Sequence, residues 1–183
     1  LDLRVGKILK LKDDLVVGKA YPYSEFDDDF EIFTEDMQKG KTVMIFDIEE
    51  IEKEVVRAGE DAVREVGLVG IPRELVHLLG ELKFRTSYGQ NVLLHSIEMA
   101  HVAGMIAEEI GADKRVAKTA ALMHDMGKAV THKIEGKHAE IGAELAKKYG
   151  MPDAVVHAIA AHHDDIEPTT PEAIIIKICD AMS

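Results

Sequence analysis

With 183 residues, 46% of them hydrophobic and only 5% aromatic, the chain is long enough for one globular domain with a proper core, or for one domain and a small appendage. Its formal charge of −12 at pH 7 argues against broad electrostatic capture of nucleic acid, because that function normally needs a basic face. The single cysteine, Cys179, excludes a disulfide framework and indicates a reducing, cytoplasmic compartment.

The sequence shows no sign of membrane insertion. No apolar stretch approaches the length of a membrane span, and no signal-peptide pattern is present. The sequence begins at Leu1 and ends at Ser183, inside what its pattern predicts to be a helix. We therefore expect a fragment of a longer protein, other parts of which could carry an anchor.

Short β-branched runs alternate with turns in residues 1–50, which predicts a small antiparallel sheet. The runs cover residues 5–11, 15–21, 30–33 and 42–46. The acidic triplet Asp27 to Asp29 lacks the spaced oxygens and the distal Glu of a calcium loop. We interpret it as a solvated turn, because runs of charge usually face water.

Residues 51–80 are predicted to form connector helices. From Ile48 to about Val66 the pattern is helical and highly charged, and Gly67 to Gly70 and Pro72 then interrupt it. A further short helix is predicted from Glu74 to Leu79.

The remaining residues, 81–183, are predicted to be almost entirely helical. Apolar residues recur at helical spacing from Asn91 to Ile110, and Gly111 stops that helix. Asp113 opens the next helix, which leads to His124. Further helices are predicted from about Lys137 to Tyr149, from Asp153 to His163, and from Thr170-Pro171 onward. The fold class is thus mainly α, with a small N-terminal β-rich segment.

A histidine and an aspartate, His124 and Asp125, follow the apolar end of a predicted helix and precede Gly127. Adjacent residues on a helix point about 100° apart, so further ligands to a shared ion must come from elsewhere in the chain. Imidazole and carboxylate ligands without thiolates suit Zn, Fe, Mn or Ni and argue against a structural zinc finger. The other candidates, on or beside helical segments, are His95, His138, His162, His163 and Asp180.

These seven candidates exceed the need of a single ion, which takes roughly four to six donors. With Asp125 as a bridge they could hold two ions. Two-metal sites stabilise the attacking and leaving oxygens of a phosphoryl displacement, so this set of ligands favours hydrolysis of phosphate esters. The remaining histidines fit surface or packing roles and are placed outside the site: His77, His101, His132 and His157.

The order of these ligands resembles a known pattern. His95, His124-Asp125 and Asp180 resemble the H…HD…D signature of the HD superfamily of metal-dependent phosphohydrolases, and the extra histidines resemble its two-metal branch. Three longer strings are similar to the catalytic domain of the ribonuclease Y family: Leu82 to Leu93, Gly136 to Gly142, and Ala158 to His163. The resemblance covers about Ile51 to Ser183. The GYP signature of the cyclic-dinucleotide phosphodiesterase branch is missing after His163.

The resemblance implies an HD-domain helical bundle that cleaves phosphoester bonds in RNA or nucleotides with two divalent ions, of Mn, Fe, Zn, Ni or Mg. Asp125 would bridge the ions and Lys128 would neutralise a phosphoryl oxygen, so these two residues are the expected catalytic ones. The first ion would be held by His95, His124, Asp125 and Asp180, and the second by Asp125, His138, His162 and His163. A homodimer through the helical domain is also implied.

Other polar residues lie just before the helix that carries His95. Ser87, Tyr88, Gln90 and Asn91 could orient substrate, or some of them could only cap that helix.

The alternative is a non-catalytic nucleotide-binding, RNA-binding or dimerisation module with a structural metal. Such a degenerate domain should have lost a ligand, and all seven are kept. The ribonuclease Y family places a membrane anchor and an RNA-binding KH domain before its catalytic domain, but residues 1–50 contain neither an anchor nor a KH-type GxxG loop. The choice between RNA and a small nucleotide as substrate therefore stays open.

Overall fold

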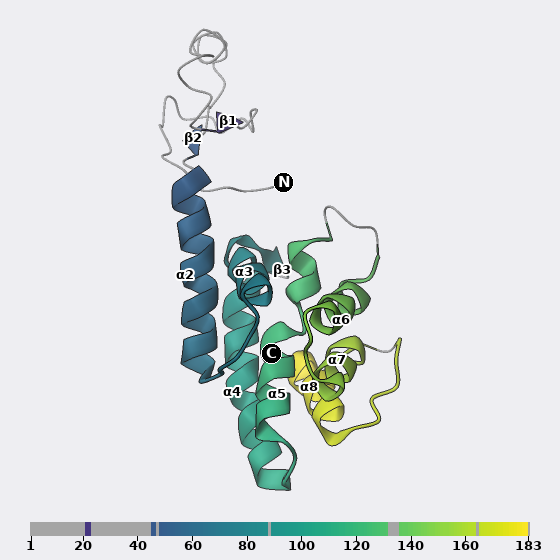
Figure 1. Cartoon of the computed structure of the whole chain (residues 1–183). Coiled ribbons are helices and arrows are strands. Elements are labelled where there is room, and N and C mark those ends of the chain that lie inside the picture. The colour runs from purple at the N-terminus through teal and green to yellow at the C-terminus, as the bar shows by residue number, and fades with distance from the viewer. Residues whose placement is uncertain are drawn as a thin grey trace, which may run out of the picture. The chain divides into compact units, whose positions relative to one another are not determined.

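The computed structural model describes residues 21–22, 45–46, 48–87, 89–131, 136–163 and 165–182, and side chains from Ile51 onward. The chain divides into two compact units, Leu1–Glu54 and Val55–Ser183. The described residues are mainly helical, as predicted (Figure 1).

In the first unit, strand β1 (Tyr21–Pro22) pairs with strand β2 (Ile45–Phe46). The pairing is parallel, so the predicted antiparallel arrangement is wrong for these two strands. The prediction assumed that neighbouring runs pair through turns, whereas a long connection between two strands also permits the parallel arrangement. The runs at 5–11 and 30–33 and the triplet at Asp27 to Asp29 lie outside the described residues.

Helix α2 (Ile48–Val66) has the predicted bounds, and its part from Val55 belongs to the second unit. Helix α3 (Arg73–Glu81) and the short 3₁₀ helix η2 (Leu82–Phe84) follow. The backbones of α2 and α3 touch, because a Cβ added to Gly59 would lie 1.9 Å from the Val76 carbonyl oxygen. Only glycine permits such an approach.

A short antiparallel hairpin that the sequence pattern did not reveal comes next, made of β3 (Thr86–Ser87) and β4 (Gln90–Asn91). It leads directly into helix α4 (Val92–Ile110), whose first turn is capped by the Asn91 side chain, which accepts a hydrogen bond from the Leu94 amide at 3.1 Å. Asn91 is therefore a capping residue, which is one of the two predicted roles.

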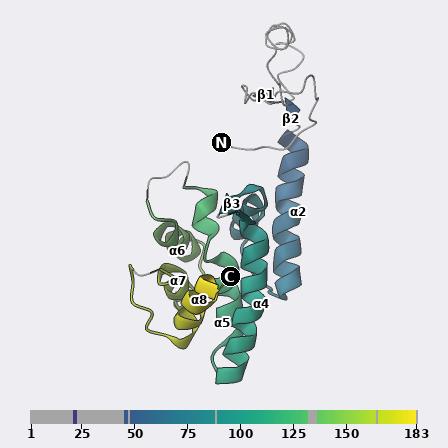
Figure 2. The same cartoon turned by 180° about the vertical axis from the view of Figure 1, so that it is seen from behind.

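The core of the second unit forms where α4 and helix α5 (Lys114–Met123) pack side by side (Figure 2). Gly111 ends α4 with φ of 74°, and the Asp113 carboxylate accepts bonds from two amides of α5. The facing residues are small, which lets the two helices approach closely. The fully buried alanines are Ala100, Ala103, Ala107, Ala117, Ala120 and Ala121.

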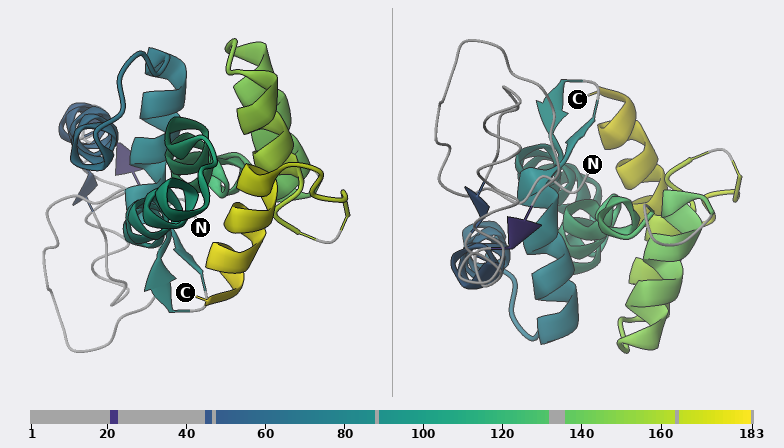
Figure 3. Two further views of the ribbon diagram at one scale, coloured as in Figure 1. Left: turned by 90° about the horizontal axis from the view of Figure 1, so that it is seen from below. Right: turned by 90° about the horizontal axis from the view of Figure 1, so that it is seen from above.

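Three further helices complete this unit: α6 (His138–Lys148), α7 (Asp153–Ala160) and α8 (Pro171–Met182). Helix α8 packs against α4, α5 and α7, and the view from below shows it beside the α4–α5 pair (Figure 3). Helix α7 ends before the predicted His163, because the chain turns after Ala160. Among the described helices, none combines the length and apolar character that crossing a membrane requires.

Candidate metal centre

The seven candidate ligands come from five places in the second unit, all at or near helix ends. His95 lies in the first turn of α4, and Asp180 lies in the last turn of α8. His138 begins α6. The other four follow the last residues of α5 and α7, where the chain leaves the helix: His124, Asp125, His162 and His163.

The structure groups six of these residues into two triads. The first triad is His95, His124 and Asp180, and the second is His138, His162 and His163; within each, one ligand atom from every residue lies within 4.8 Å of the others. Each triad brings together residues from different helices, or from the turns that follow them, that pack against one another.

In the first triad, one carboxylate oxygen faces two imidazoles. Asp180 Oδ1 lies 3.5 Å from His95 Nε2 and 3.4 Å from His124 Nε2. The His124 ring is fully buried, and its Nε2 is the buried side-chain nitrogen that lacks a hydrogen-bond partner in the described part of the chain. An unpaired nitrogen so buried is costly, whereas a cation bound there would satisfy it.

In the second triad, the three imidazoles turn the same ring atom toward one point. His138 Nε2 lies 3.3 Å from His162 Nε2 and 3.0 Å from His163 Nε2. With metal–nitrogen bonds of about 2.1 Å, the edges of a tetrahedral or octahedral shell measure roughly 3.0–3.4 Å. The spacing of these nitrogens therefore fits the coordination of one ion.

Asp125 lies between the two triads, because each of its two carboxylate oxygens faces a different triad. Asp125 Oδ2 lies 3.4 Å from His124 Nε2, and Asp125 Oδ1 lies 3.3 Å from His138 Nε2. The residue is only 3% exposed, so the carboxylate is held in this orientation by its surroundings. A carboxylate placed in this way can bridge two ions.

Backbone carbonyls orient the two buried histidines. His124 Nδ1 lies 2.8 Å from the Ala121 carbonyl oxygen, and His162 Nδ1 lies 2.6 Å from the Ile159 carbonyl oxygen. When Nδ1–H donates to a carbonyl, the lone pair of Nε2 is left for a ligand bond, and the ring is fixed in direction. The turn at the end of each helix thus fixes the direction of its histidine ring.

The electrostatics of the site favour a cation. Burial opposes a charge on His124, but the carboxylates of Asp125 and Asp180 outweigh it and raise the pKa of His124 to about 9. Burial likewise works against ionisation of Asp125, yet His124 and Lys128 hold the pKa of this carboxyl well below its usual range. The same carboxylates that attract a proton to His124 would attract a metal ion.

His162 is in the opposite situation, since burial lowers its pKa to about 3 and the charge on His124 adds to this effect. Burial also lowers the pKa of His138. Both rings are therefore neutral at pH 7, which is the state that binds metal.

Beside the triads lies a pocket of about 440 Å³ that gives access to them. Lys128, on the 3₁₀ helix η3 (Met126–Ala129), lines it and donates a hydrogen bond to Asp125 Oδ2 at 2.7 Å. The residues that line the pocket are Ser87, Gln90, Val92, His95, Asp125, Lys128, His138, His163 and Asp180.

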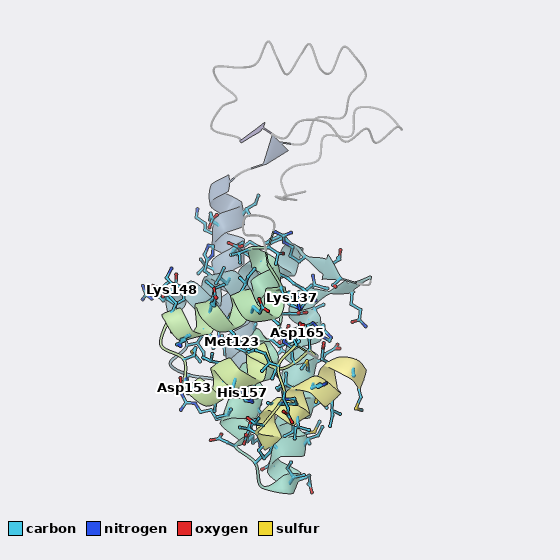
Figure 4. All side chains as sticks on the ribbon, turned by 90° about the vertical axis from the view of Figure 1, so that its right-hand side faces the viewer. Met123, Lys137, Lys148, Asp153, His157 and Asp165 are labelled. Carbon is cyan, nitrogen blue, oxygen red and sulfur yellow. The ribbon has the colours of Figure 1, made fainter. Side chains whose placement is uncertain are left out.

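An exposed ion pair joins the two segments that carry the second triad. Lys137, which precedes His138, pairs with Asp165, and the two side chains lie next to one another in Figure 4. An exposed pair contributes at most about 1 kcal/mol, so it supports the site only modestly.

The histidines that the sequence placed elsewhere are indeed outside the triads. His77 pairs with Glu81, His101 is exposed, and His157 Nε2 accepts the Thr169 amide hydrogen at 3.1 Å. His132 and Tyr88 lie outside the described residues. Ser87 and Gln90 line the pocket. The sequence had left open whether they orient substrate or cap the helix that carries His95.

Comparisons with known proteins show which family the chain matches. The HD domain family matches residues 92–183, half of the chain, and the HDOD domain family matches residues 46–135. Proteins called Ribonuclease Y are similar over 134 residues, 73% of this chain: that of Thermoanaerobacter pseudethanolicus at 60% identity, of Thermobifida fusca at 57%, and of Fervidobacterium nodosum at 52%. No solved structure matches.

These matches cover most of this chain but a small part of each relative. The aligned region is 26–27% of each of these relatives, so the chain spans about a quarter of their length. The HD domain match begins at α4 and contains all seven candidate ligands. With this match and the helical architecture together, the chain belongs to the HD-domain family.

Proposed function

We propose that this domain is a metal-dependent phosphodiesterase that cleaves phosphoester bonds in RNA or nucleotides. The observation that carries the proposal is Asp125, whose two oxygens face two separate ligand triads. Membership of the HD-domain family and similarity to proteins called Ribonuclease Y support a phosphohydrolase, and specifically a nuclease. RNA as the substrate is only proposed, because the match covers about a quarter of the length of those relatives and their name describes the whole protein.

Two divalent ions are the proposed cofactors. His95, His124 and Asp180 would hold one, His138, His162 and His163 would hold the other, and Asp125 would contact both. The buried, unpaired Nε2 of His124 and the spacing of the second triad support this fit. Ions in such sites stabilise negative charge on phosphoryl oxygens and lower the pKa of water toward about 7.

The chain's own residues would bind and orient the substrate. Lys128 is half-buried in the pocket and already lies beside Asp125, so its ammonium would meet a phosphate that enters between the triads. A fixed cation of this kind stabilises the charge that builds on phosphoryl oxygens in the transition state. Buried Val92 supplies an apolar part of the pocket wall.

Two further expectations stay predictions: a homodimer through the helical domain, which the resemblance implies, and a cytoplasmic location, which the single cysteine indicates.

Metal content and turnover, measured together, test the proposal. Protein purified without oxygen is analysed for metals and then assayed with bis(p-nitrophenyl) phosphate, with and without added manganese. We expect about two ions per chain and metal-dependent turnover. Asp125→Ala should abolish both, while His101→Gln, which alters an exposed histidine on the same helix as His95, should change neither.

The outcomes separate the candidate functions. One ion or none, with no turnover under any metal, would favour the non-catalytic binding or dimerisation module instead. Full activity of Asp125→Ala would overturn the two-metal assignment. His95→Gln provides the matched comparison for His101→Gln, since both lie on α4 but only His95 faces Asp180.

A further inference from the structure

The pocket contains two polar side chains that neither ligate the proposed ions nor carry charge. These are Ser87 and Gln90, from the hairpin of β3 and β4. Apart from Val92, which is buried and apolar, every other lining residue is a proposed ligand or Lys128. The hairpin therefore supplies the neutral hydrogen-bonding groups of the site.

The register of the hairpin directs both side chains to the same place. Ser87 pairs with Gln90, and Thr86 pairs with Asn91. Directly opposed residues of an antiparallel pair project from the same face, and their neighbours along each strand project from the other. Ser87 and Gln90 accordingly face the pocket as a pair, whereas Thr86 and Asn91 lie on the reverse face and do not line it.

Hydrogen bonds hold this hairpin firmly against the site. The Val92 amide donates to the Arg85 carbonyl at 3.1 Å, and the Asn91 side-chain amide donates to the Lys83 carbonyl at 2.6 Å. Arg85 also donates to the Ala129 carbonyl at 3.4 Å, in the 3₁₀ helix that carries Lys128. The base of the hairpin is thus tied to the element that would bind phosphate.

The two pocket-facing groups are available for a substrate. Among the described residues, none forms a hydrogen bond with the Ser87 hydroxyl or the Gln90 carboxamide. A hydroxyl and a carboxamide each offer a donor and an acceptor. A rigid scaffold that presents unused donors and acceptors is the arrangement expected of a specificity pocket.

We propose that Ser87 and Gln90 recognise the ribose 2′-hydroxyl beside the scissile phosphate, so that the site selects ribonucleotide over deoxyribonucleotide linkages. This inference rests on the proposed phosphodiesterase function. The charged members of the pocket, the ligands and Lys128, match a phosphate and cations. The neutral pair matches the group next to that phosphate, which is a hydroxyl in RNA and absent from DNA.

The alternative, that the pair reads the base, is less consistent with its position. Gln90 lies only five residues before His95, and β4 runs straight into the helix that carries this ligand. The hairpin therefore abuts the ligand cluster, where the sugar of a bound phosphodiester must lie. The bases extend from the sugars away from the phosphate.

Two dinucleotides that differ in one group test the inference. UpU is compared with dUpU, which lacks only the 2′-hydroxyl beside the phosphate, in the metal-loaded protein. We expect wild type to favour UpU in kcat/KM. Gln90→Ala and Ser87→Ala should each lower the UpU-to-dUpU ratio, by up to about tenfold for the loss of one neutral hydrogen bond. Thr86→Ala, on the reverse face, should keep the wild-type ratio.

The readouts keep this inference separate from the function on which it rests. A wild-type ratio of one, or an unchanged ratio in the double alanine variant, would overturn the inference while turnover of bis(p-nitrophenyl) phosphate still supports a phosphodiesterase. No turnover of that minimal substrate by wild type would overturn both. Metal content and melting temperature verify that each variant is folded, and Gln90→Glu, of nearly the same shape, replaces any variant that is not.

Discussion

The substitution Gly127→Ala tests whether the spacing between η3 and α6 determines the distances between the ligands of the second triad. A Cβ at this position would lie 2.0 Å from the carbonyl oxygen of His138, the first residue of α6 and a proposed ligand. Real Cβ atoms essentially never approach another atom closer than 3.0 Å, so the two elements must separate by at least about 1 Å. Ligand distances tolerate changes of only about 0.2 Å, so the second ion should be lost.

The expected result is a change from about two ions per chain to one, because the first triad lies on other elements. Overpacking of this kind also costs about 1–3 kcal/mol, which lowers the melting temperature by roughly 3–10 °C. Metal analysis after dialysis against a weak chelator and thermal unfolding measure the two effects.

Gly142→Ala is the matched control on the facing helix. A Cβ there would meet its nearest atoms, Gly127 N and Ile159 Cγ2, at 3.4 Å, which is ordinary contact. Alanine is also the better helix former, so this variant should keep both ions and wild-type stability. Retention of two ions and an unchanged melting temperature in Gly127→Ala would refute the reasoning, as would equal loss of both ions.

Three further predictions concern pH, packing and metal. In metal-free protein, the pKa of His162 lies near 3, below its unfolded value of about 6.5, so its contribution to stability is complete above pH 6.5 and is lost as the pH falls. Between pH 6.5 and pH 5 the free energy of unfolding should drop by about 2 kcal/mol, and urea titrations in chelator that give a flat profile would contradict this. Gly80→Ala would place a Cβ 1.9 Å from the Val55 carbonyl oxygen, a backbone atom, whereas Gly104→Ala would place one 2.7 Å from Cγ of Lys118, a side-chain atom that only a change of the Lys118 rotamer can move. Thermal unfolding should therefore show that Gly80→Ala lowers the free energy of unfolding by about 1–3 kcal/mol and that Gly104→Ala lowers it clearly less. Equal losses in the two variants would argue against this packing. A divalent ion at about 100 times its dissociation constant should add about 2.7 kcal/mol of stability per site, and a melting temperature insensitive to chelator would count against any metal centre.

Most of the helical framework could be predicted from the sequence, because its signals are local. The spacing of apolar residues gave the bounds of α2 and, within one residue, of α4. The caps at Asn91 and Asp113 and the stop at Gly111 act on the adjacent turn, and the structure shows each of them. Such interactions need no knowledge of what lies on the other side of the molecule.

The sequence also determined which residue types are available to bind metal, but their grouping depended on the tertiary structure. His95 and Asp180 are 85 positions apart and meet only because α4 packs against α8. Likewise, the two directions in which Asp125 presents its oxygens depend on where α5 ends and how η3 packs against α6.

The hairpin of β3 and β4 and the parallel pairing of β1 with β2 could not be predicted from local sequence signals, because both depend on contacts with other segments. Two-residue strands such as Thr86–Ser87 carry no periodic pattern. This strand pairs with β4, which in turn contacts η2 and α4. The parallel pairing of β1 with β2 joins segments separated by a long connection, which no turn signal encodes. Local chemistry thus determined the helices and the types of candidate ligand, whereas packing between distant segments decided which candidate ligands lie together and which side chains line the pocket.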